Sequence, residues 1–223
     1  MVQTKAEAET LRVLEKKRSI LDAASKTFRE KGFHKTGMRD VAARVGMTVG
    51  NLYYYFRNKE DLLAFCQEET LGRLDTLVRR LDAESLPAAD RLGRLIVGHV
   101  RCLNEGIPGT LAHLEIPGDG GADLRARRDR YEASLRRILR EGVAEGSFVP
   151  CDEKVAAMAI LGSVNWTVRW FRPDGPASAD EIGRAFAGQL VRGLLKPELA
   201  AGIRPESWSA PIGPGPESTE VTS

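Results

Sequence analysis

Apolar residues recur along most of the chain with the spacing of amphipathic helices. Within Leu11–Lys31, the residues Ile20, Ala24 and Phe28 follow one another at intervals of four and fall on one helix face. Gly32 comes directly after this segment, where glycine commonly ends a helix. The pattern predicts a first helix over this range.

Two short helices are predicted next, over Met38–Val45 and Val49–Phe56. Thr36 is placed to cap the first helix, Gly46 to end it, and Thr48 to cap the second. Two short helices joined by about three residues at a glycine have the spacing of a helix-turn-helix.

The remaining pattern predicts a larger helical region. An irregular stretch, GIPGTLAHLEIPGDGGAD, interrupts it, with a single turn expected at Leu111–Glu115. The long helices are expected over 59–81, 87–103, 122–145, 153–171 and 178–195. The fold class is therefore all-α, with a three-helix helix-turn-helix domain followed by a larger helical domain.

Four parts of the chain follow from this reading. They are an N-terminal extension (1–15), a helix-turn-helix domain (16–62), a larger helical domain (63–203), and a tail (204–223). The tail is rich in Pro, Gly and Ser and is expected to be disordered.

The segment 49–56 has two different faces. Leu52 and Phe56 lie on an apolar stripe, whereas Gly50, Asn51 and Tyr54 point away from it, with Tyr53 beside them. A glycine within a helix costs about 1 kcal/mol relative to alanine, so Gly50 indicates close approach to another surface. Phenol and amide groups can bond phosphates and base edges, which favours DNA as that surface.

The charge distribution agrees with a nucleic-acid partner. The chain has a net charge of +2, but residues 1–62 hold 13 Lys/Arg against 8 Asp/Glu, whereas the rest hold 20 against 23. The first part is thus +5 and the second −3. A basic segment on a nearly neutral body suits a polyanion, although a merely solvated basic face fits the charge equally well.

Enzymatic and metal-binding readings find little support. Cys66, Cys102 and Cys151 are odd in number and widely spaced, which argues against a disulfide framework or a zinc site. His99 and Cys102 could join His113 at a metal, but a packing role is preferred because no further ligand motif accompanies them. No catalytic residue, metal or cofactor is expected.

The location of the protein follows from what its sequence lacks. The first ten residues, MVQTKAEAET, have no signal-peptide pattern, and no apolar run approaches the roughly 20 residues that span a bilayer. We expect a cytoplasmic protein without membrane contact.

The residues from Arg18 to Leu63 resemble the DNA-binding domain of the TetR family of bacterial repressors. At their centre stands GFHKTGMRDVAARVGMTVGNLYYYFRNKEDLL. The matching positions are Phe28, Gly32, Thr36, Val41, Ala42, Gly46, Gly50, Leu52, Tyr53, Tyr55, Phe56, Lys59 and Leu63.

This resemblance implies that residues 16–62 form a DNA-binding domain and that residues 63–203 form a ligand-binding and dimerisation domain. It also implies a set of DNA-contacting residues. Roles at or near the bases are implied for Arg39, Val49, Gly50 and Asn51, and phosphate roles for Thr36, Gly37, Thr48, Tyr53, Tyr54 and Lys59. The family often has Ser or Thr where this chain has Gly37, so a contact there would come from the backbone N–H.

A homodimer is expected because one short recognition helix buries too little DNA to select an operator. Two heads about 34–36 Å apart can read a near-palindrome. The candidate interface is the stripe Ile182, Phe186, Leu190 and Leu194, which could instead be internal core.

The stretch NWTVRWFRPDG resembles the C-terminal domain of a TetR branch that senses fatty acyl-CoA or related thioesters, and RARRDRYEASLRRILREGVAEGSF fits that branch too. The resemblance implies an apolar channel for the acyl chain and arginines for the CoA phosphates. Core or dimer-interface aromatics and a solvated arginine face are the alternatives. The implied ligand residues are Trp166, Arg169, Trp170, Arg127, Arg128 and Arg130.

These inferences predict a ligand-responsive regulator, most simply a repressor. It would bind a palindromic double-stranded operator as a dimer and be released by a small effector, for which the resemblance implies an acyl-CoA in the control of lipid catabolism. The alternatives are an architectural DNA-binding protein without an effector and a TetR-type regulator that senses another hydrophobic molecule, as multidrug regulators do.

Overall fold

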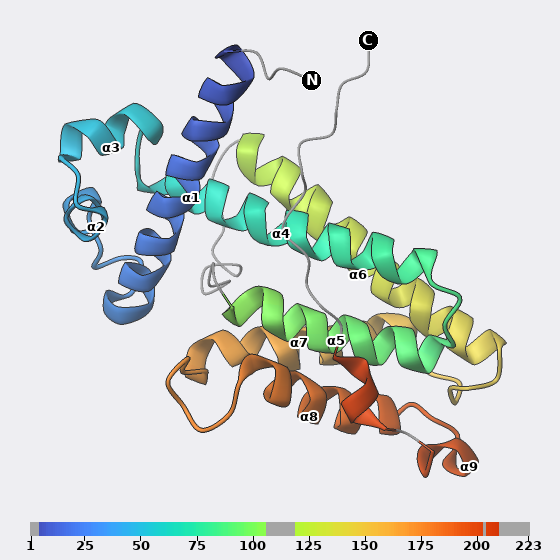
Figure 1. The fold of residues 1–223 in the computed structure, drawn as a ribbon. Helices are drawn as coiled ribbons and strands as arrows, with labels where there is room; N and C mark the ends of the chain where they lie inside the picture. Colours follow the sequence, from blue (N-terminus) through green and yellow to red (C-terminus); the bar gives the residue numbers. More distant parts are fainter. Residues whose placement is uncertain (1–4, 106–118, 203, 210–223) are drawn as a thin grey trace.

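The computed structural model describes residues 5–105, 119–202 and 204–209, and these form helices joined by turns (Figure 1). One isolated antiparallel bridge, between Phe148 and Leu195, is the sole β pairing within these ranges. The helices are α1 (Lys5–Lys31), α2 (Met38–Val45), α3 (Val49–Tyr55), α4 (Lys59–Ala83), α5 (Ala88–Asn104), α6 (Asp119–Ala144), α7 (Glu153–Trp170), α8 (Ala179–Arg192), α9 (Pro197–Ala200) and the 3₁₀ turn η1 (Pro205–Trp208).

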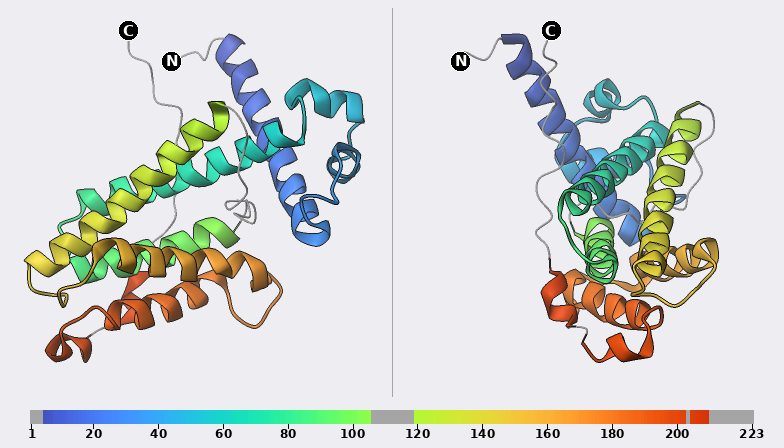
Figure 2. Two further views of the ribbon diagram at one scale, coloured as in Figure 1. Left: turned by 180° about the vertical axis from the view of Figure 1, so that it is seen from behind. Right: turned by 90° about the vertical axis from the view of Figure 1, so that its right-hand side faces the viewer.

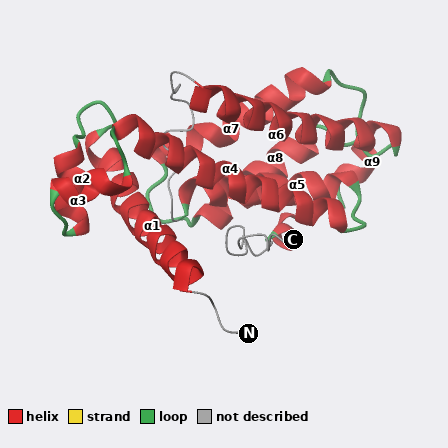
Figure 3. Cartoon of the chain, turned by 90° about the horizontal axis from the view of Figure 1, so that it is seen from above, coloured by secondary structure: helices red, strands yellow, loops and turns green. Residues whose placement is uncertain are grey.

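The first three helices form a head at one side of the molecule (Figure 1). Ile20 and Phe28 of α1 are buried against Leu52 of α3 and its C-cap Phe56, and Leu62 at the start of α4 completes this part of the core. The helix α4 then leaves the head and runs into the larger body, as the view from above also shows (Figure 3). The head and the body therefore share α4.

The body is built around α5, which α4, α6, α7 and α8 contact (Figure 2). The closest approach is between α5 and α8. Ala179, Gly183, Ala187 and Val191 recur every four residues on the buried face of α8. A Cβ on Gly183 would lie 3.0 Å from Val97 Cα, so glycine is required where the two backbones meet. None of the helices in the described ranges combines the length and apolar character needed to cross a bilayer.

The prediction of a disordered tail is wrong for residues 204–209. Trp208 is 1% exposed, its indole covers Gly93 of α5, and its Nε1–H donates to Asp90 Oδ1 at 2.9 Å. Pro205 lies against Gly188 of α8. The burial of a large aromatic side chain outweighs the weak local preference of this Pro- and Ser-containing segment.

Two other boundaries differ from the sequence-based expectation. The first helix begins at Lys5, so the expected extension 1–15 is part of α1 from that residue onward. The helix expected from Ala122 begins at Asp119, so residues 119–121 belong to α6 and not to the irregular stretch. The turn expected at Leu111–Glu115 lies outside the described residues.

Candidate functional site

The outer face of α3 presents polar groups to solvent. Tyr54 is 77% exposed and Tyr53 is 49% exposed, and Gly50 and Asn51 are exposed beside them. Leu52 is fully buried on the opposite face. The predicted orientation of this short helix is confirmed, and its contact with DNA stays a prediction.

Local hydrogen bonds start and orient α3. Gly46 adopts a left-handed conformation (φ 72°), which ends α2 and turns the chain. Thr48 then caps α3, because its Oγ1 accepts a hydrogen bond from the Asn51 N–H at 3.2 Å. That bond uses the hydroxyl oxygen as an acceptor, so its proton remains available for a phosphate oxygen. Val49 is half-buried in the first turn, and Arg39 on α2 is exposed.

The donors at Thr36 and Gly37, for which phosphate contacts are implied, already have partners within the head. Thr36 is 2% exposed and its hydroxyl donates to the Gly32 carbonyl at 2.8 Å. The Gly37 N–H donates to Asp40 Oδ2 at 2.8 Å. Both donors are used within the head, where Gly37, and not the expected Thr36, is the N-cap of α2.

Ion pairs hold α2 against α1. Lys31 Nζ lies 2.6 Å from Asp40 Oδ1, and this contact, with the Gly37 N–H, holds the pKa of the Asp40 carboxyl below its ordinary value. Arg44 makes two bonds to the Glu30 carboxylate, at 2.8 and 2.6 Å. Two ion pairs therefore connect α2 to α1 in addition to the core that these helices share.

Lys59 stands at the first position of α4 and is half-buried. Its ammonium donates to the Phe33 carbonyl at 2.9 Å and lies 4.3 Å from the centre of the Phe33 ring. An ammonium has three donors, so this bond leaves two for a phosphate. The structure gives Lys59 a role within the head in addition to the implied DNA contact.

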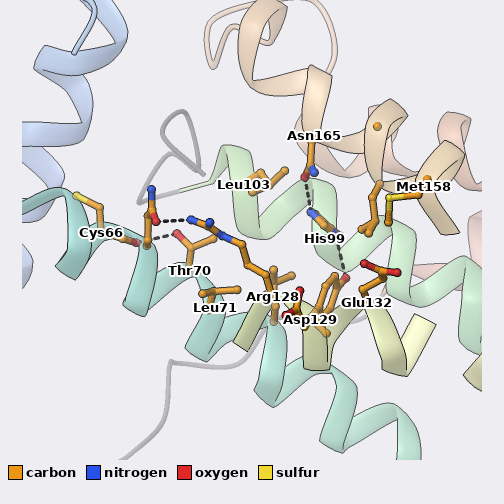
Figure 4. A pocket seen from close by; sticks show the side chains of 15 residues that line it. Cys66, Thr70, Leu71, His99, Leu103, Arg128, Asp129, Glu132, Met158 and Asn165 are labelled. Atoms are coloured by element: carbon orange, nitrogen blue, oxygen red, sulfur yellow. Dashed lines mark hydrogen bonds between the residues drawn. The ribbon is translucent and has the colours of Figure 1, made fainter. Parts of the chain in front are cut away.

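The body contains a cavity of about 390 Å³ that opens to solvent and is lined by residues of α4, α5, α6 and α7 (Figure 4). Leu71 and Leu74 of α4, Leu103 of α5 and Leu161 of α7 form apolar parts of its wall. Cys66 also lines it, and burial raises the pKa of this thiol, which stays protonated. A mainly apolar cavity with a few polar groups is typical of a small-molecule site.

Two groups of hydrogen-bonded polar side chains link neighbouring helices at the wall of this cavity. Arg128 of α6 donates to the Gln67 side chain of α4. His99 of α5 lies between Tyr131 of α6 and Asn165 of α7, with 2.8 Å from Nδ1 to the Tyr131 hydroxyl and 3.1 Å from Nε2 to Asn165 Oδ1. Figure 4 shows Asn165 and His99 facing each other across the α5–α7 boundary. Burial lowers the pKa of His99 to about 4.

Of the six implied ligand residues, Arg128 alone lines this cavity. Arg127 pairs with Asp75 at 2.8 Å on the side of α4, and Arg130 is exposed. Trp166 and Trp170 are 62% and 45% exposed, and Arg169 lies over the Trp166 ring at 5.8 Å. The helix α7 turns Asn165 toward the cavity, and it turns both tryptophans to its outer face.

That outer face of α7 is unusually apolar. Val155, Trp166 and Trp170 are large exposed hydrophobic residues on it. Trp170 stacks on the half-buried Phe186 of α8, with 6.3 Å between ring centres. The other members of the expected interface stripe, Ile182, Leu190 and Leu194, are half-buried against the core. Their role in a dimer stays a prediction.

The polar cavity residues that the sequence-based prediction missed include His99, Tyr131 and Asn165. For His99 the signal was a polar group within a buried stripe, because it follows Leu95 by four residues and precedes Leu103 by four. A histidine in that register is enclosed when the helix packs on both sides, as α5 does. In the described part of the chain no group of three or more His, Cys, Asp or Glu side chains is placed to hold a metal ion.

Comparisons with known proteins agree with this arrangement. Residues 20–65 match the family described as bacterial regulatory proteins, tetR family, and residues 85–194 match the tetracyclin repressor-like C-terminal domain. The HTH-type transcriptional repressor KstR2 of Mycolicibacterium smegmatis is 27% identical over 191 residues, which cover 79% of this chain and 89% of that protein.

Two solved structures extend the likeness to the whole fold. The TetR family transcriptional regulator PfmR from Thermus thermophilus has a TM-score of 0.70 and 35% identity, and the match covers 79% of this chain and 99% of that one. AibR, solved in complex with isovaleryl coenzyme A and operator DNA, has a TM-score of 0.68 and 25% identity over 78% of this chain and 97% of its own. This chain belongs to the TetR family of helix-turn-helix transcriptional regulators.

Proposed function

We propose that this protein is a dimeric repressor that binds a near-palindromic operator through α3 and is released when an acyl-CoA enters the cavity. The observation that carries the proposal is the position of α4. Lys59 and Leu62 at its start belong to the head, and Gln67, Leu71 and Leu74 further along it line the cavity wall. A ligand that displaces this wall therefore acts on the element that orients the recognition helix.

The cavity suits the acyl part of such a ligand. Its volume of about 390 Å³ is near the lower end of the range of small-molecule pockets, roughly 300–1,000 Å³. It is too small to enclose a whole acyl-CoA, so the nucleotide would lie outside. Met158, Gly162 and Asn165 line the cavity and are also exposed, which makes this side of α7 the natural exit.

The DNA-binding half of the proposal rests on the exposed face of α3 and the basic head. Asn51, Tyr53 and Tyr54 offer donors to the major groove and its phosphates. A near-palindromic operator needs a second copy of α3, which a dimer supplies. The surface proposed to join the two copies is the apolar outer face of α7, where Trp170 stacks on Phe186 of α8.

The test is a titration in two stages. An operator is first selected from a random-sequence DNA library, and binding is measured in the absence of ligand. Acyl-CoAs of graded chain length, free CoA and free fatty acids are then added, with binding to the protein followed by calorimetry. We expect acyl-CoAs to bind and to lower operator affinity, because a ligand releases DNA only as far as it prefers the released state.

Other outcomes separate the alternatives. Release by a hydrophobic compound without CoA would favour a regulator of the multidrug type. Operator binding with no uptake of any ligand would favour an architectural DNA-binding protein.

A further inference from the structure

The polar group at the α5–α7 boundary is built from three helices. Tyr131 comes from α6, His99 from α5 and Asn165 from α7, and all three line the cavity. Tyr131 is 5% exposed and His99 is 4% exposed. Buried polar groups are tolerated when they are paired, and both ring nitrogens of His99 have partners.

The contacts assign the protons in this network. Asn165 turns its amide oxygen toward His99, so Nε2 carries the hydrogen and donates to Oδ1 over 3.1 Å. The other nitrogen, Nδ1, then accepts the Tyr131 hydroxyl proton over 2.8 Å. The histidine is neutral at physiological pH because burial lowers its pKa to about 4. The network is an uncharged chain of donors that ends on an amide oxygen.

Because the side-chain oxygen of Asn165 faces His99, its side-chain nitrogen points away from the histidine. The NH₂ group of Asn165 carries two donors that this network does not use, and it lies on the wall of the cavity at the exposed, α7 side. Among the described residues, Asp129 and Glu132 line the same cavity together with a single cation, Arg128, whose guanidinium donates to Gln67, so the charged groups on the wall do not favour an anion. The acceptor that the amide suits is therefore a neutral oxygen. Leu71, Leu74 and Leu161 offer an apolar space further along the wall.

We propose that Asn165 donates a hydrogen bond to the thioester carbonyl oxygen of the effector, with His99 and Tyr131 as the residues that position its amide. This inference rests on the proposed function and specifies how the ligand is held. The acyl chain enters the apolar space, the carbonyl lies at the rim against Asn165, and the CoA portion extends outward past α7. The site then distinguishes a thioester from a ligand of equal length without the carbonyl.

The test uses a matched pair of ligands. One is an acyl-CoA that the protein binds, and the other is the S-alkyl-CoA thioether of the same chain length, in which CH₂ replaces the carbonyl. We expect the unmodified protein to bind the thioester about tenfold more tightly, as one hydrogen bond in a partly enclosed site allows. Calorimetry on both ligands gives this ratio directly.

Two substitutions at Asn165 examine the donor itself. Asn165→Asp keeps an oxygen acceptor for His99 but removes the N–H donors, and Asn165→Leu removes both at similar volume. We expect both variants to lose the preference for the thioester over the thioether. In Asn165→Leu the affinity for the thioether itself should change little. Tyr131→Phe, which frees Nδ1 of His99, is expected to reduce the preference partially. Thermal unfolding of each variant establishes that it is folded.

The outcomes are separable. If the unmodified protein binds neither ligand, the proposed acyl-CoA function fails. If it binds the acyl-CoA and all variants retain the same thioester-to-thioether ratio, the effector class stands and the assignment of Asn165 is overturned.

Discussion

Gly93 illustrates how one absent side chain lets the segment 204–209 pack onto the core. A Cβ at this position would overlap the Trp208 indole. The indole is 1% exposed and its N–H is bonded to Asp90, one turn before Gly93 on α5. A helix interior gains nothing from glycine, so packing accounts for its presence.

We therefore predict that Gly93→Ala lowers stability by about 1–3 kcal/mol, the usual cost of forcing extra volume into a packed core, although alanine is the better helix former. Urea unfolding followed by circular dichroism measures this. Gly50→Ala is the control, because open space surrounds Gly50, and its stability should be unchanged or slightly higher. Equal losses in both variants would contradict the packing argument.

His99 is expected to make stability depend on pH. Its folded pKa of about 4 lies below the ordinary value of 6.5, so the unfolded chain binds the proton more readily between these values. The contribution of His99 to the free energy of unfolding is therefore present in full well above pH 6.5 and declines as the pH falls toward 4. We expect the free energy of unfolding to fall by about 2 kcal/mol between pH 7 and pH 5 from this group.

The measurement is the urea midpoint at several pH values in this window. In a His99→Gln variant the urea midpoint should vary less with pH than in the unmodified protein. His34 lies on the surface, so His34→Gln should leave the dependence of the midpoint on pH unchanged. A profile that His99→Gln leaves unaltered would show that other groups cause the dependence.

At the scale of elements, α3 combines an anchored face with an exposed one over seven residues. Leu52 is fully buried and the C-cap Phe56 is 3% exposed, whereas Tyr54 is 77% exposed. The hydrophobic periodicity already assigned these faces, because in so short a helix the spacing alone decides which side meets the core. The caps Thr48 and Gly46 were likewise predictable from local chemistry.

We predict that Tyr54→Phe weakens operator binding about tenfold without changing stability, because it removes one phenolic donor from each head of a dimer. Tyr55→Phe is the matched control, since Tyr55 is half-buried on the adjoining side. Fluorescence anisotropy with labelled operator gives both affinities. Equal effects of the two substitutions would contradict the proposed DNA-facing side.

For the molecule as a whole, the exposed apolar face of α7 is the feature that most needs a partner. Val155, Trp166 and Trp170 leave large hydrophobic surface in the solvent. A surface of this kind marks an interaction site, and a second copy would cover it while placing two heads on one operator.

We predict that Trp170→Glu shifts the protein from dimer to monomer and abolishes tight operator binding. Sedimentation velocity over a range of concentrations measures the first effect and anisotropy the second. Leu199→Glu, on the short helix α9, is a control with a similarly exposed apolar residue (44%). If Trp170→Glu remains as dimeric as the control, the interface lies elsewhere.

The order and approximate bounds of α1 to α8, the helix-turn-helix and the outward face of α3 were predictable from local spacing, since each depends on residues within a turn or two of one another. Long-range packing decided the rest. The hydroxyl of Thr36 is enclosed, Trp208 is drawn onto α5, and α7 directs Asn165 inward while Trp166 and Trp170 point outward. These outcomes depend on which helices lie side by side, and periodicity along one segment carries no information about its neighbours.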